Sequence, residues 1–505
     1  MGKFFANGGP VTTAGSIMDQ KGVRVQFIRQ DNTSQNQAEL VAFAKALSGG
    51  EPEPGVGVHF VSIMGDASAQ FVKAVNDQIA PQKCEIISSN GYSRGEDKFM
   101  GQPAWKENPQ ASLGSVVAAV LRDGDWNIVM KWAADNGLKV NPDERTYDPD
   151  AINWYASDDY LKAAEAYNTK VCETRDIVKN GKRTGDSKNV CVTGVTTWTP
   201  GDVNIAQGRG GLVSIVSTKE YRYQMPEVTI GIASWNQAHA DLVSSYVAAI
   251  FEGGAAVRGD PKALQKAAEI SSKIYAEQDA SYWKKYYKLR TEEDSTGLEV
   301  ELGGSSVNTL ADAQQLFGLA PGSSNIFAAT YTIFAKIVQQ QYPQILPEFP
   351  AVETVFNPQY IQRAASKVRV QAKADVAKFV ESDTLSETVS KRAWTILFDS
   401  GKATITPTSR ITLQELTSHL EIAGGLAIRI EGHTDNVGDP GMNRLLSKAR
   451  AEAVRDYLMG VSSSNFPAER FVTPIGLGDS VPVSSNSSEV GRSKNRRVVI
   501  ALGNQ

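Results

Sequence analysis

The feature that most constrains the fold is a long alternation of strand-like and helix-like segments between residues 23 and 235. Short apolar runs recur there, and most are followed by a stretch with apolar residues at helical spacing. Strands that alternate with single helices predict parallel sheets flanked by helices, so the expected fold class is α/β. The strand-like runs are residues 23–28, 56–65, 84–90, 115–121, 151–156, 192–199, 212–218 and 226–235.

From residue 236 the spacing becomes helical, and a proline-rich segment then interrupts it. Residues 343–358 carry four prolines and predict an extended linker, and residues 360–387 predict a connecting helix. A fresh pattern of strand, helix, strand, helix, strand begins near Trp394 and predicts a small α+β domain. The expected organisation is a large domain, a linker with its helix, and a small domain, at residues 1–345, 346–391 and 392–505.

The composition argues against several classes of function. A net charge of −4 over 505 residues argues against a nucleic-acid-binding surface. We expect no transmembrane segment, because no apolar run reaches the ~20 residues that span a bilayer. Four histidines and three cysteines show no CxxC or HExxH spacing, so we expect no metal site and no cofactor. The scattered histidines also leave little for general-base catalysis, so an enzyme is not expected.

Two of the cysteines bracket a hairpin-like segment. Asn180-Gly181, a favoured two-residue turn, lies between Cys172 and Cys191. Strands that fold back at this turn would bring the two sulfurs together, and a disulfide would imply an oxidising compartment. The spacing alone is equally compatible with two free thiols.

An acid and a base flank a glycine-rich corner in the small domain. Asp435 follows a strand, and Arg450 lies two turns into the next helix. On that helix we expect an apolar stripe to face the core, with Asn443, Ser447 and Arg450 along one edge of it. The stripe comprises Met442, Leu446, Ala449, Ala453 and Tyr457.

The spacing of this pair has two interpretations. In the structural one, Asp435 forms an Asx turn or caps the helix, and Arg450 is its salt-bridge partner. In the functional one, the two side chains converge on a pocket and hold a ligand that carries both charges. Asp439-Pro440 already supplies an N-cap with proline at the first helical position, so Asp435 is less needed for capping.

Four motifs of the small domain resemble the OmpA-like C-terminal domain, over about residues 392–502: FDSGKATITP, IEGHTDNVG, LLSKARAEAVRDYL and GRSKNRRV. The resemblance implies peptidoglycan binding, in which an aspartate and an arginine hold the ammonium and carboxylate at the free end of diaminopimelate in the stem peptide. Met442 departs from the family, which commonly has an aromatic residue there. The residues that the resemblance assigns to the ligand are Asp435, Arg450, Asn443, Thr434 and Arg496.

Most of the first 350 residues resemble the periplasmic solute-binding proteins of ABC importers, in the branch of nitrate, sulfonate and thiamine-precursor binders. This resemblance implies a two-lobed domain with a solute cleft between the lobes, at the carboxyl ends of strands. The stretches that carry it are residues 22–32, 114–138, 195–221 and 225–254.

Four loops at strand ends are expected to line this cleft. Their aromatic and mixed charged side chains suit a small polar or zwitterionic solute. The ordinary alternative for each residue is a helix-capping aspartate or a tryptophan that fills the core. The cleft candidates are Asp66, Tyr92, Arg94, Arg122, Asp125, Trp126, Trp198 and Asp202, with Asp97 and Asp123 beside them.

Together these features predict a non-enzymatic protein of the periplasm or cell envelope that binds a small polar solute and is anchored to peptidoglycan. The alternative is a peptidoglycan-anchored scaffold whose large domain binds a protein partner. The expected partners are the peptidoglycan stem peptide, the solute, and an ABC permease or another envelope protein. The N-terminus is not a secretion signal as it stands, so we expect an export signal and a first strand upstream of it.

Overall fold

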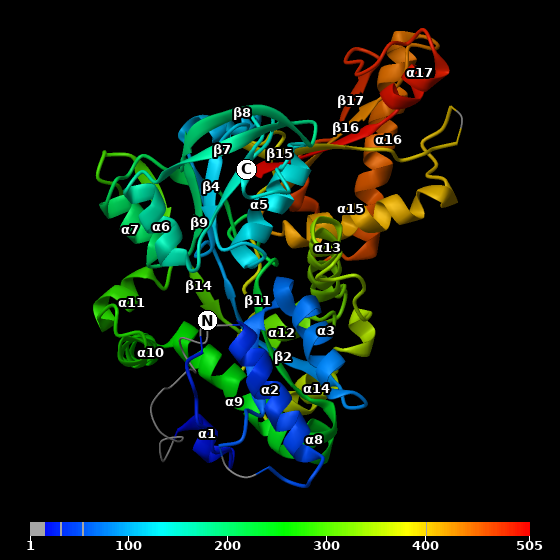
Figure 1. The fold of residues 1–505 in the computed structure, drawn as a ribbon. Coiled ribbons are helices and arrows are strands. Elements are labelled where there is room, and N and C mark those ends of the chain that lie inside the picture. The colour runs from blue at the N-terminus through cyan, green and yellow to red at the C-terminus, as the bar shows by residue number, and fades with distance from the viewer. Residues whose placement is uncertain (1–15, 31–32, 53–54, 400) are drawn as a thin grey trace.

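The computed structural model describes residues 16–30, 33–52, 55–399 and 401–505. Figure 1 shows two lobes, one above the other, and a smaller C-terminal domain at the upper right. Two helices, α1 (Ile17–Gln20) and α2 (Thr33–Leu47), precede the first strand. The prediction of a strand at residues 23–28 is wrong, because this segment belongs to none of the sheets. Its apolar alternation reflects side chains such as Val23 that pack against the core.

The first lobe is built on a four-stranded sheet in the order β1-β11-β2-β14. Every neighbouring pair in this sheet is antiparallel, so the predicted parallel sheet is wrong for this lobe. Strands β1 and β2 do run in the same direction, but β11 returns from the second lobe and lies between them. The bounds are β1 (Phe60–Met64), β2 (Cys84–Ser93), β11 (Pro226–Ile232) and β14 (Ser305–Val307).

Helices bury most of this sheet, whose central strands have no exposed residue. The longest, α9, is apolar enough to cross a membrane by length and composition, but 67% of its most apolar window is buried inside the protein, as in a core helix. The helices of this lobe are α3 (Ser68–Ile79), α8 (Ala233–Ala238), α9 (Ala240–Gly259), α12 (Leu310–Leu316), α13 (Ile326–Gln341) and α14 (Gln359–Ala365).

The second lobe contains a five-stranded sheet in the order β10-β3-β9-β4-β6. Its parallel neighbouring pairs are β9–β4 and β4–β6, and these strands carry the predicted strand–helix alternation. The strands are β3 (Lys98–Gly101), β4 (Val116–Ala119), β6 (Asn153–Ala156), β9 (Gly194–Thr197) and β10 (Val213–Ser217). The helices are α4 (Pro103–Glu107), α5 (Gly124–Asp135), α6 (Tyr160–Asn168) and α7 (Gly201–Gln207).

The chain passes from the first lobe to the second at residues 94–97, the first crossing, and returns at residues 218–225, the second crossing. Residues 303–304, the third crossing, lead from a segment beside the junction back into the first-lobe sheet. Before the third crossing it forms two helices and a hairpin beside the junction, at the left of Figure 1. These elements are α10 (Pro261–Ile274), α11 (Ala280–Tyr286), β12 (Arg290–Glu293) and β13 (Glu299–Leu302).

The cysteine pair closes a hairpin on the second lobe. Strands β7 (Cys172–Lys179) and β8 (Lys182–Cys191) pair from end to end, with the short β5 (Thr146–Tyr147) beside β7. Asn180 and Gly181 have φ angles of 51° and 73°, as the predicted two-residue turn requires. Cys172 and Cys191 form a disulfide, which decides between the two alternatives that the spacing left open.

The prediction of a connecting helix over residues 360–387 is wrong beyond α14, which ends at Ala365. Residues 367–386, here called the strap, are extended and belong to no helix or strand. Side chains of the first lobe hold its backbone in place of helical hydrogen bonds: the N–H groups of Arg369 and Asp375 donate to Glu252 and Asp312, both at 2.5 Å. The strap thus follows the surface of the first lobe before it enters the C-terminal domain.

The C-terminal domain has a four-stranded sheet in the order β15-β18-β16-β17. Its first strand begins at Glu387, before the predicted strand near Trp394, and β17 and α17 were not predicted. The strands are β15 (Glu387–Trp394), β16 (Ala427–His433), β17 (Ile475–Gly478) and β18 (Val498–Asn504). The helices are α15 (Arg410–Ile422), α16 (Pro440–Val461) and α17 (Glu489–Asn495).

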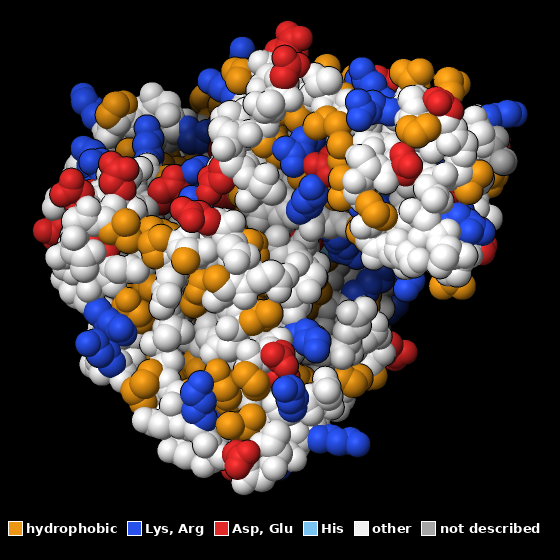
Figure 2. Space-filling view, turned by 90° about the horizontal axis from the view of Figure 1, so that it is seen from above, with side chains coloured by type: hydrophobic (Ala, Val, Ile, Leu, Met, Phe, Trp, Pro, Cys, Tyr) orange, Lys and Arg blue, Asp and Glu red, His pale blue; other side chains and the backbone are white. Residues whose placement is uncertain are grey.

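The C-terminal domain packs on the larger region. At the second crossing, the Tyr223 N–H donates to the Ile422 carbonyl at 3.1 Å. On the first lobe, Asn465 donates to the Ser324 hydroxyl at 2.6 Å, and α15 packs on α13. On the second lobe, α5 packs on β15. Figure 2 shows the domain as a separate mass beside the larger region, with acidic and basic side chains interspersed over both.

Candidate functional site

The charged corner of the C-terminal domain lies where β16 ends and α16 begins. Asp439 caps α16 by accepting from the Met442 N–H at 2.9 Å, with Pro440 at the first helical position, as predicted. The helix then approaches the sheet so closely that a Cβ atom at Gly432 would collide with the Ser447 carbonyl oxygen. A glycine is therefore required beneath this turn of the helix.

The predicted apolar stripe of α16 is wrong. Met442, which was expected to begin it, is 63% exposed. The line of Asn443, Ser447 and Arg450, predicted at the edge of the core face, is instead buried. The close approach at Gly432 explains this, since small or backbone-bonding side chains fit against the sheet where a larger apolar one would not. The buried residues of α16 are Asn443, Ser447, Arg450, Ala451, Val454 and Leu458.

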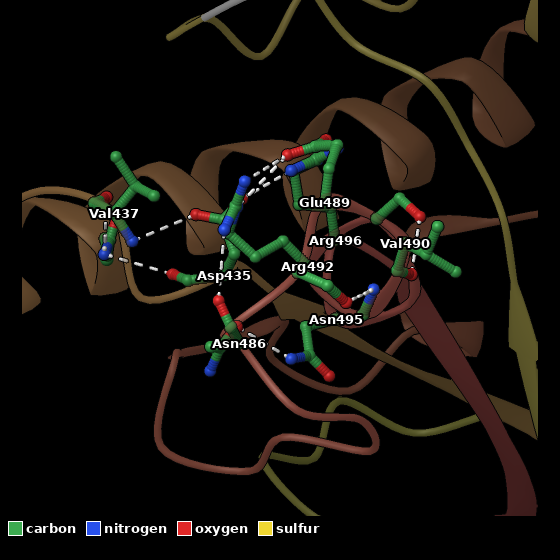
Figure 3. A network of polar contacts seen from close by, with 12 residues as sticks. Asp435, Val437, Asn486, Glu489, Val490, Arg492, Asn495 and Arg496 are labelled. Carbon is green, nitrogen blue, oxygen red and sulfur yellow. Dashed lines mark hydrogen bonds and ion pairs between the residues drawn. The ribbon is translucent and has the colours of Figure 1, made fainter.

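Asp435 is held by its own loop and by an arginine from another element. Its Oδ1 accepts from the Val437 N–H at 3.1 Å, which is the Asx turn of the structural interpretation. Its Oδ2 forms an ion pair at 2.5 Å with Arg496, whose other terminal nitrogen pairs with Glu489 at 2.5 Å (Figure 3). The predicted salt bridge between Asp435 and Arg450 is therefore wrong, because Arg496 occupies that carboxylate.

Arg450 lies near the same corner. Its Nε donates to the Lys402 carbonyl at 3.1 Å, and its guanidinium carbon lies 5.0 Å from the centre of the Phe398 ring. Within the described part of the chain, its two terminal nitrogens have no hydrogen bond or ion pair. Burial and the charge of Arg496 lower the pKa of Arg450, and the charge of Asp435 opposes them. Arg450 thus has donors to offer a ligand.

The other residues assigned to this ligand shape the corner. Asn443 donates to the backbone carbonyls of Asp435 and Val437, at 3.3 and 3.2 Å, and so fixes the loop. The Thr434 hydroxyl is buried and has no hydrogen-bond partner among the described residues. Burial, with the charge of Arg497, lowers the pKa of His433 to about 4, so this histidine is neutral at physiological pH.

Glu489 is the residue of this corner that the sequence did not indicate. It opens α17 and lies one helix length before Arg496, which it holds against Asp435 in Figure 3. Glu489 accepts hydrogen bonds from Arg496 and Arg492, and these bonds lower its pKa. A signal existed in the sequence, since a glutamate in the first turn of a basic helix is a common ion-pair pattern, but α17 itself was not predicted.

Part of the predicted cleft is a buried polar cluster where the lobes meet. Asp66 accepts hydrogen bonds at 3.2 Å from Asn127 of the second lobe and from Gln224 of the second crossing. Burial raises the pKa of Asp66 to about 7. Burial also raises the pKa of Asp97 to about 6, and burial together with the charge of Asp97 raises the pKa of Asp125 well above its usual range. The cluster therefore retains protons near neutral pH.

Tyr92 and Arg94 form a second group, at the first crossing. The Arg94 guanidinium lies 3.7 Å from the centre of the Tyr92 ring, and burial lowers its pKa to about 10. Its Nε lies 3.7 Å from the carboxylate of Asp375 in the strap, which also pairs with Arg222 at 2.8 Å. Asp375 of the strap, and not a solute, thus supplies the negative charge that faces Arg94.

The other cleft candidates are engaged elsewhere. Asp202 forms a fully buried ion pair with Lys98 at 2.5 Å. Three more candidates pack against aromatic rings, and their distances to the ring centre are Trp198–Tyr160 3.8 Å, Arg122–Tyr342 5.0 Å and Trp126–Tyr342 5.7 Å. The eight candidates therefore form separate groups and do not line one common pocket. No set of three His, Cys, Asp or Glu side chains in the described ranges is placed to hold a metal ion.

A small cavity of about 20 Å³ lies beside these groups, between the crossings and helices α10 and α11. Sequence reasoning missed it, because its aromatic wall comes from a helical region that showed no motif. The side chains that line it include Glu96, Thr199, Trp283, Tyr286, Tyr287 and Ser305.

Comparison with known proteins assigns the domain that carries the charged corner. Residues 397–496 match the OmpA family. The C-terminal domain is an OmpA-like domain. Over 109 residues it is 39% identical to the outer-membrane lipoprotein YfiB of Pseudomonas aeruginosa and 35% identical to the peptidoglycan-binding protein ArfA of Mycobacterium tuberculosis. Each match covers 21% of this chain, and the chain spans 61% and 32% of those two proteins.

Two solved structures are similar to parts of the chain. The cell wall anchor of the T6SS from Pseudomonas aeruginosa is 30% identical, with a TM-score of 0.20, over 24% of this chain and 87% of that one. The periplasmic nitrate-binding protein NrtA from Synechocystis PCC 6803 is 11% identical, with a TM-score of 0.43, over 69% of this chain and 81% of that one.

Proposed function

We propose that the OmpA-like domain binds peptidoglycan by holding the zwitterionic end of diaminopimelate in a stem peptide. The observation that carries this proposal is that the Asp435 carboxylate lies close enough to Arg450 for their charges to interact, while the terminal nitrogens of Arg450 have no partner among the described residues. A carboxylate accepts hydrogen bonds from an ammonium, and a guanidinium donates two parallel hydrogen bonds to a carboxylate. The corner therefore offers complementary groups for both charges of an amino-acid terminus.

Arg496 has a defined part in this proposal. In the absence of ligand it neutralises Asp435, and it is itself held by Glu489. An incoming ammonium group competes with Arg496 for the Asp435 carboxylate. Glu489 then retains Arg496 at the edge of the corner, so the displaced guanidinium keeps a partner.

The relatives support this assignment. ArfA of Mycobacterium tuberculosis is named as a peptidoglycan-binding protein, and its matching segment is the OmpA-like domain. We therefore propose that this chain acts in the periplasm or cell envelope, associated with peptidoglycan.

For the large region we propose a non-enzymatic role, the binding of a small polar solute between the two lobes. One observation supports it: the buried polar cluster around Asp66, which lies where the two lobes meet. An ABC permease or another envelope protein would receive the solute.

A second function, a wall-anchored scaffold that binds a protein partner, is favoured by one observation. The OmpA-like domain and the strap contact both the first lobe and the crossings, through Ile422, Asn465 and Asp375. Such contacts restrict the hinge motion by which two-lobed binding proteins close on solutes. A thermal-shift screen of the full chain against small anions, amino acids and amines separates the two: a ligand that raises the Tm supports solute binding, and no rise across the panel favours the scaffold.

Retention of the purified chain on cell-wall sacculi tests the wall-binding proposal. The informative variant is Asp435→Asn, because asparagine keeps an oxygen for the Val437 N–H and preserves the turn. We expect this variant to lose most of its retention. The matched control is Asp456→Asn, an exposed aspartate towards the far end of α16, which should bind like wild type. Undiminished retention of Asp435→Asn would refute the proposal.

A further inference from the structure

The disulfide-closed hairpin of β7 and β8 is exposed over most of its length. Of the ten residues of β8 only Val190 is buried, and in β7 only Arg175 and Val178 are buried. A two-stranded hairpin that is exposed on both faces is marginally stable in water, so the Cys172–Cys191 disulfide at its base helps to hold the strands together. The hairpin contributes little to the core, and its projecting side chains are accessible to a partner.

The hairpin carries an excess of positive charge on a negatively charged protein. Residues 172–191 contain five basic and three acidic side chains, whereas the whole chain has a net charge of −4. Lys179 and Lys182, which flank the turn at the tip, are exposed and have no ion pair among the described residues. The other three basic side chains have partners within the protein: Arg175 pairs with Glu173, Arg183 pairs with Asp176, and Lys188 lies over the Tyr147 ring.

The two tip lysines lie directly opposite each other. Lys179 and Lys182 are partners in the register of the hairpin, and like charges at such positions destabilise the pairing of two strands. Lysines also protect the free edge of a sheet from a further strand, which accounts for Lys182 on the edge strand β8. Edge protection does not account for Lys179, because β7 lies between β5 and β8. An anionic partner outside the protein would compensate this repulsion.

The hairpin lies on the same side of the molecule as the charged corner of the OmpA-like domain. In Figure 1, β7 and β8 lie at the top of the second lobe, and α17, which begins at Glu489 of the corner, lies at the top of the C-terminal domain. Figure 2 looks down on this side and shows lysine and arginine side chains on both parts. A polymer that is bound at the corner and extends over this side therefore meets the hairpin as well.

We propose that the tip of this hairpin is a second wall contact, at which Lys179 and Lys182 bind carboxylates of peptidoglycan stem peptides. The inference rests on the proposed binding of peptidoglycan by the OmpA-like domain and adds a contact on the large region. Stem peptides recur along the polymer and carry free carboxylates, so a neighbouring stem peptide supplies the opposite charge. Exposed ion pairs are individually weak, but a second contact with the same polymer strengthens retention because its ligand is already held nearby.

Retention of the full chain on sacculi at increasing NaCl concentration tests this contact with the double variant Lys179→Gln/Lys182→Gln. Because the two lysines repel each other, the variant should fold at least as well as wild type. We expect it to bind about three- to tenfold more weakly at low salt, and the difference should disappear at high salt, where exposed charges are screened. The matched control, Lys262→Gln/Lys284→Gln, removes two exposed lysines from α10 and α11 and should bind like wild type.

Equal retention of the tip variant and wild type at low salt would overturn the inference. An equal loss in the control variant would also overturn it, since only the net charge would then matter. Vesicles of phosphatidylglycerol and phosphatidylcholine supply a further comparison. If the tip variant loses binding to these vesicles and keeps its retention on sacculi, the hairpin contacts a lipid surface and the inference is wrong.

The variant Asp435→Asn separates this inference from the proposed function. If Asp435→Asn loses retention and the tip variant does not, diaminopimelate recognition at the corner stands and the hairpin contact is wrong. If Asp435→Asn keeps its retention and the tip variant loses it, the corner is wrong and the hairpin contact stands.

Discussion

Replacing Arg470 by methionine is expected to destabilise the OmpA-like domain by about 4 kcal/mol. Arg470 is 1% exposed, and burial lowers its pKa to about 10, so it remains charged at neutral pH. Its guanidinium donates to four backbone carbonyls, those of Leu420, Ala423, Leu426 and Asn465, at 2.6 to 3.0 Å. Two of these carbonyls belong to the C-terminal end of α15, which has no further helical turn to satisfy them.

The magnitude follows from counting these contacts. Four hydrogen bonds at about 1 kcal/mol net each give about 4 kcal/mol, within the 3–5 kcal/mol typical of a disrupted buried charge network. Arg470→Lys keeps the charge but cannot reach all four carbonyls, so we expect about half the loss.

Urea unfolding, followed by hydrogen exchange in α15, measures the effect of Arg470→Met. The control is Arg455→Met, an arginine on the exposed face of α16 whose partner is Asp456. Its loss should change the free energy of unfolding by less than about 0.5 kcal/mol. A loss below about 1 kcal/mol for Arg470→Met would contradict the reasoning, since it would mean that water or a rearranged backbone satisfies the four carbonyls.

Three further predictions concern the large region. Replacing Cys172 and Cys191 by serine should lower the free energy of unfolding of the second lobe by about 3 kcal/mol in urea, because the disulfide closes a loop of 19 residues. Asp66→Asn should be more stable than wild type at pH 8, and the difference in stability should shrink as the pH falls below 7. The reason is that the pKa of Asp66 is raised in the folded protein, so the wild-type protein becomes more stable when Asp66 takes up its proton. Melting temperatures measured across this pH range test the prediction, and a constant difference between the two proteins would contradict it. Asp375→Ala should speed proteolytic cleavage of the strap, since it removes the ion pair with Arg222, and unchanged cleavage kinetics would count against that role.

Features set by neighbouring residues were predictable from the sequence. The Asn180-Gly181 turn brings Cys172 and Cys191 together because the backbone angles of those two residues fix the hairpin. Asp439 caps α16 for a similar local reason, since the capping bond spans three residues. The Asx turn at Asp435 is local too, and it was one of the two interpretations considered.

Features set by distant parts of the chain were not predictable. The partner of Asp435 is Arg496, and only the packing of an unpredicted helix places it there. The buried face of α16 was misassigned, because its composition reflects a close helix–sheet approach at Gly432 that helical spacing does not encode. In the strap, the sequence predicts a helix, whereas contacts with side chains of the first lobe hold the backbone extended.

The predicted cleft also depends on contacts between distant parts of the chain, which the sequence pattern does not show. The candidate loops were expected to line one cleft, but their side chains divide among separate groups. Arg94 faces the strap, Tyr92 packs against Arg94, and Asp66 and Asp125 belong to the buried polar cluster. Helices α10 and α11 form one side of the cavity. They lie beside the crossings because the chain returns to the first lobe at the third crossing.

The central claim is that Asp435 and Arg450 together recognise a zwitterion. Calorimetric titration of the full chain with meso-diaminopimelate and with pimelate tests it most directly, because pimelate has the same two carboxylates and lacks both ammonium groups. The account predicts measurable binding of diaminopimelate and none of pimelate. Equal binding of the two, or binding of neither by a chain that still adheres to sacculi, would contradict it.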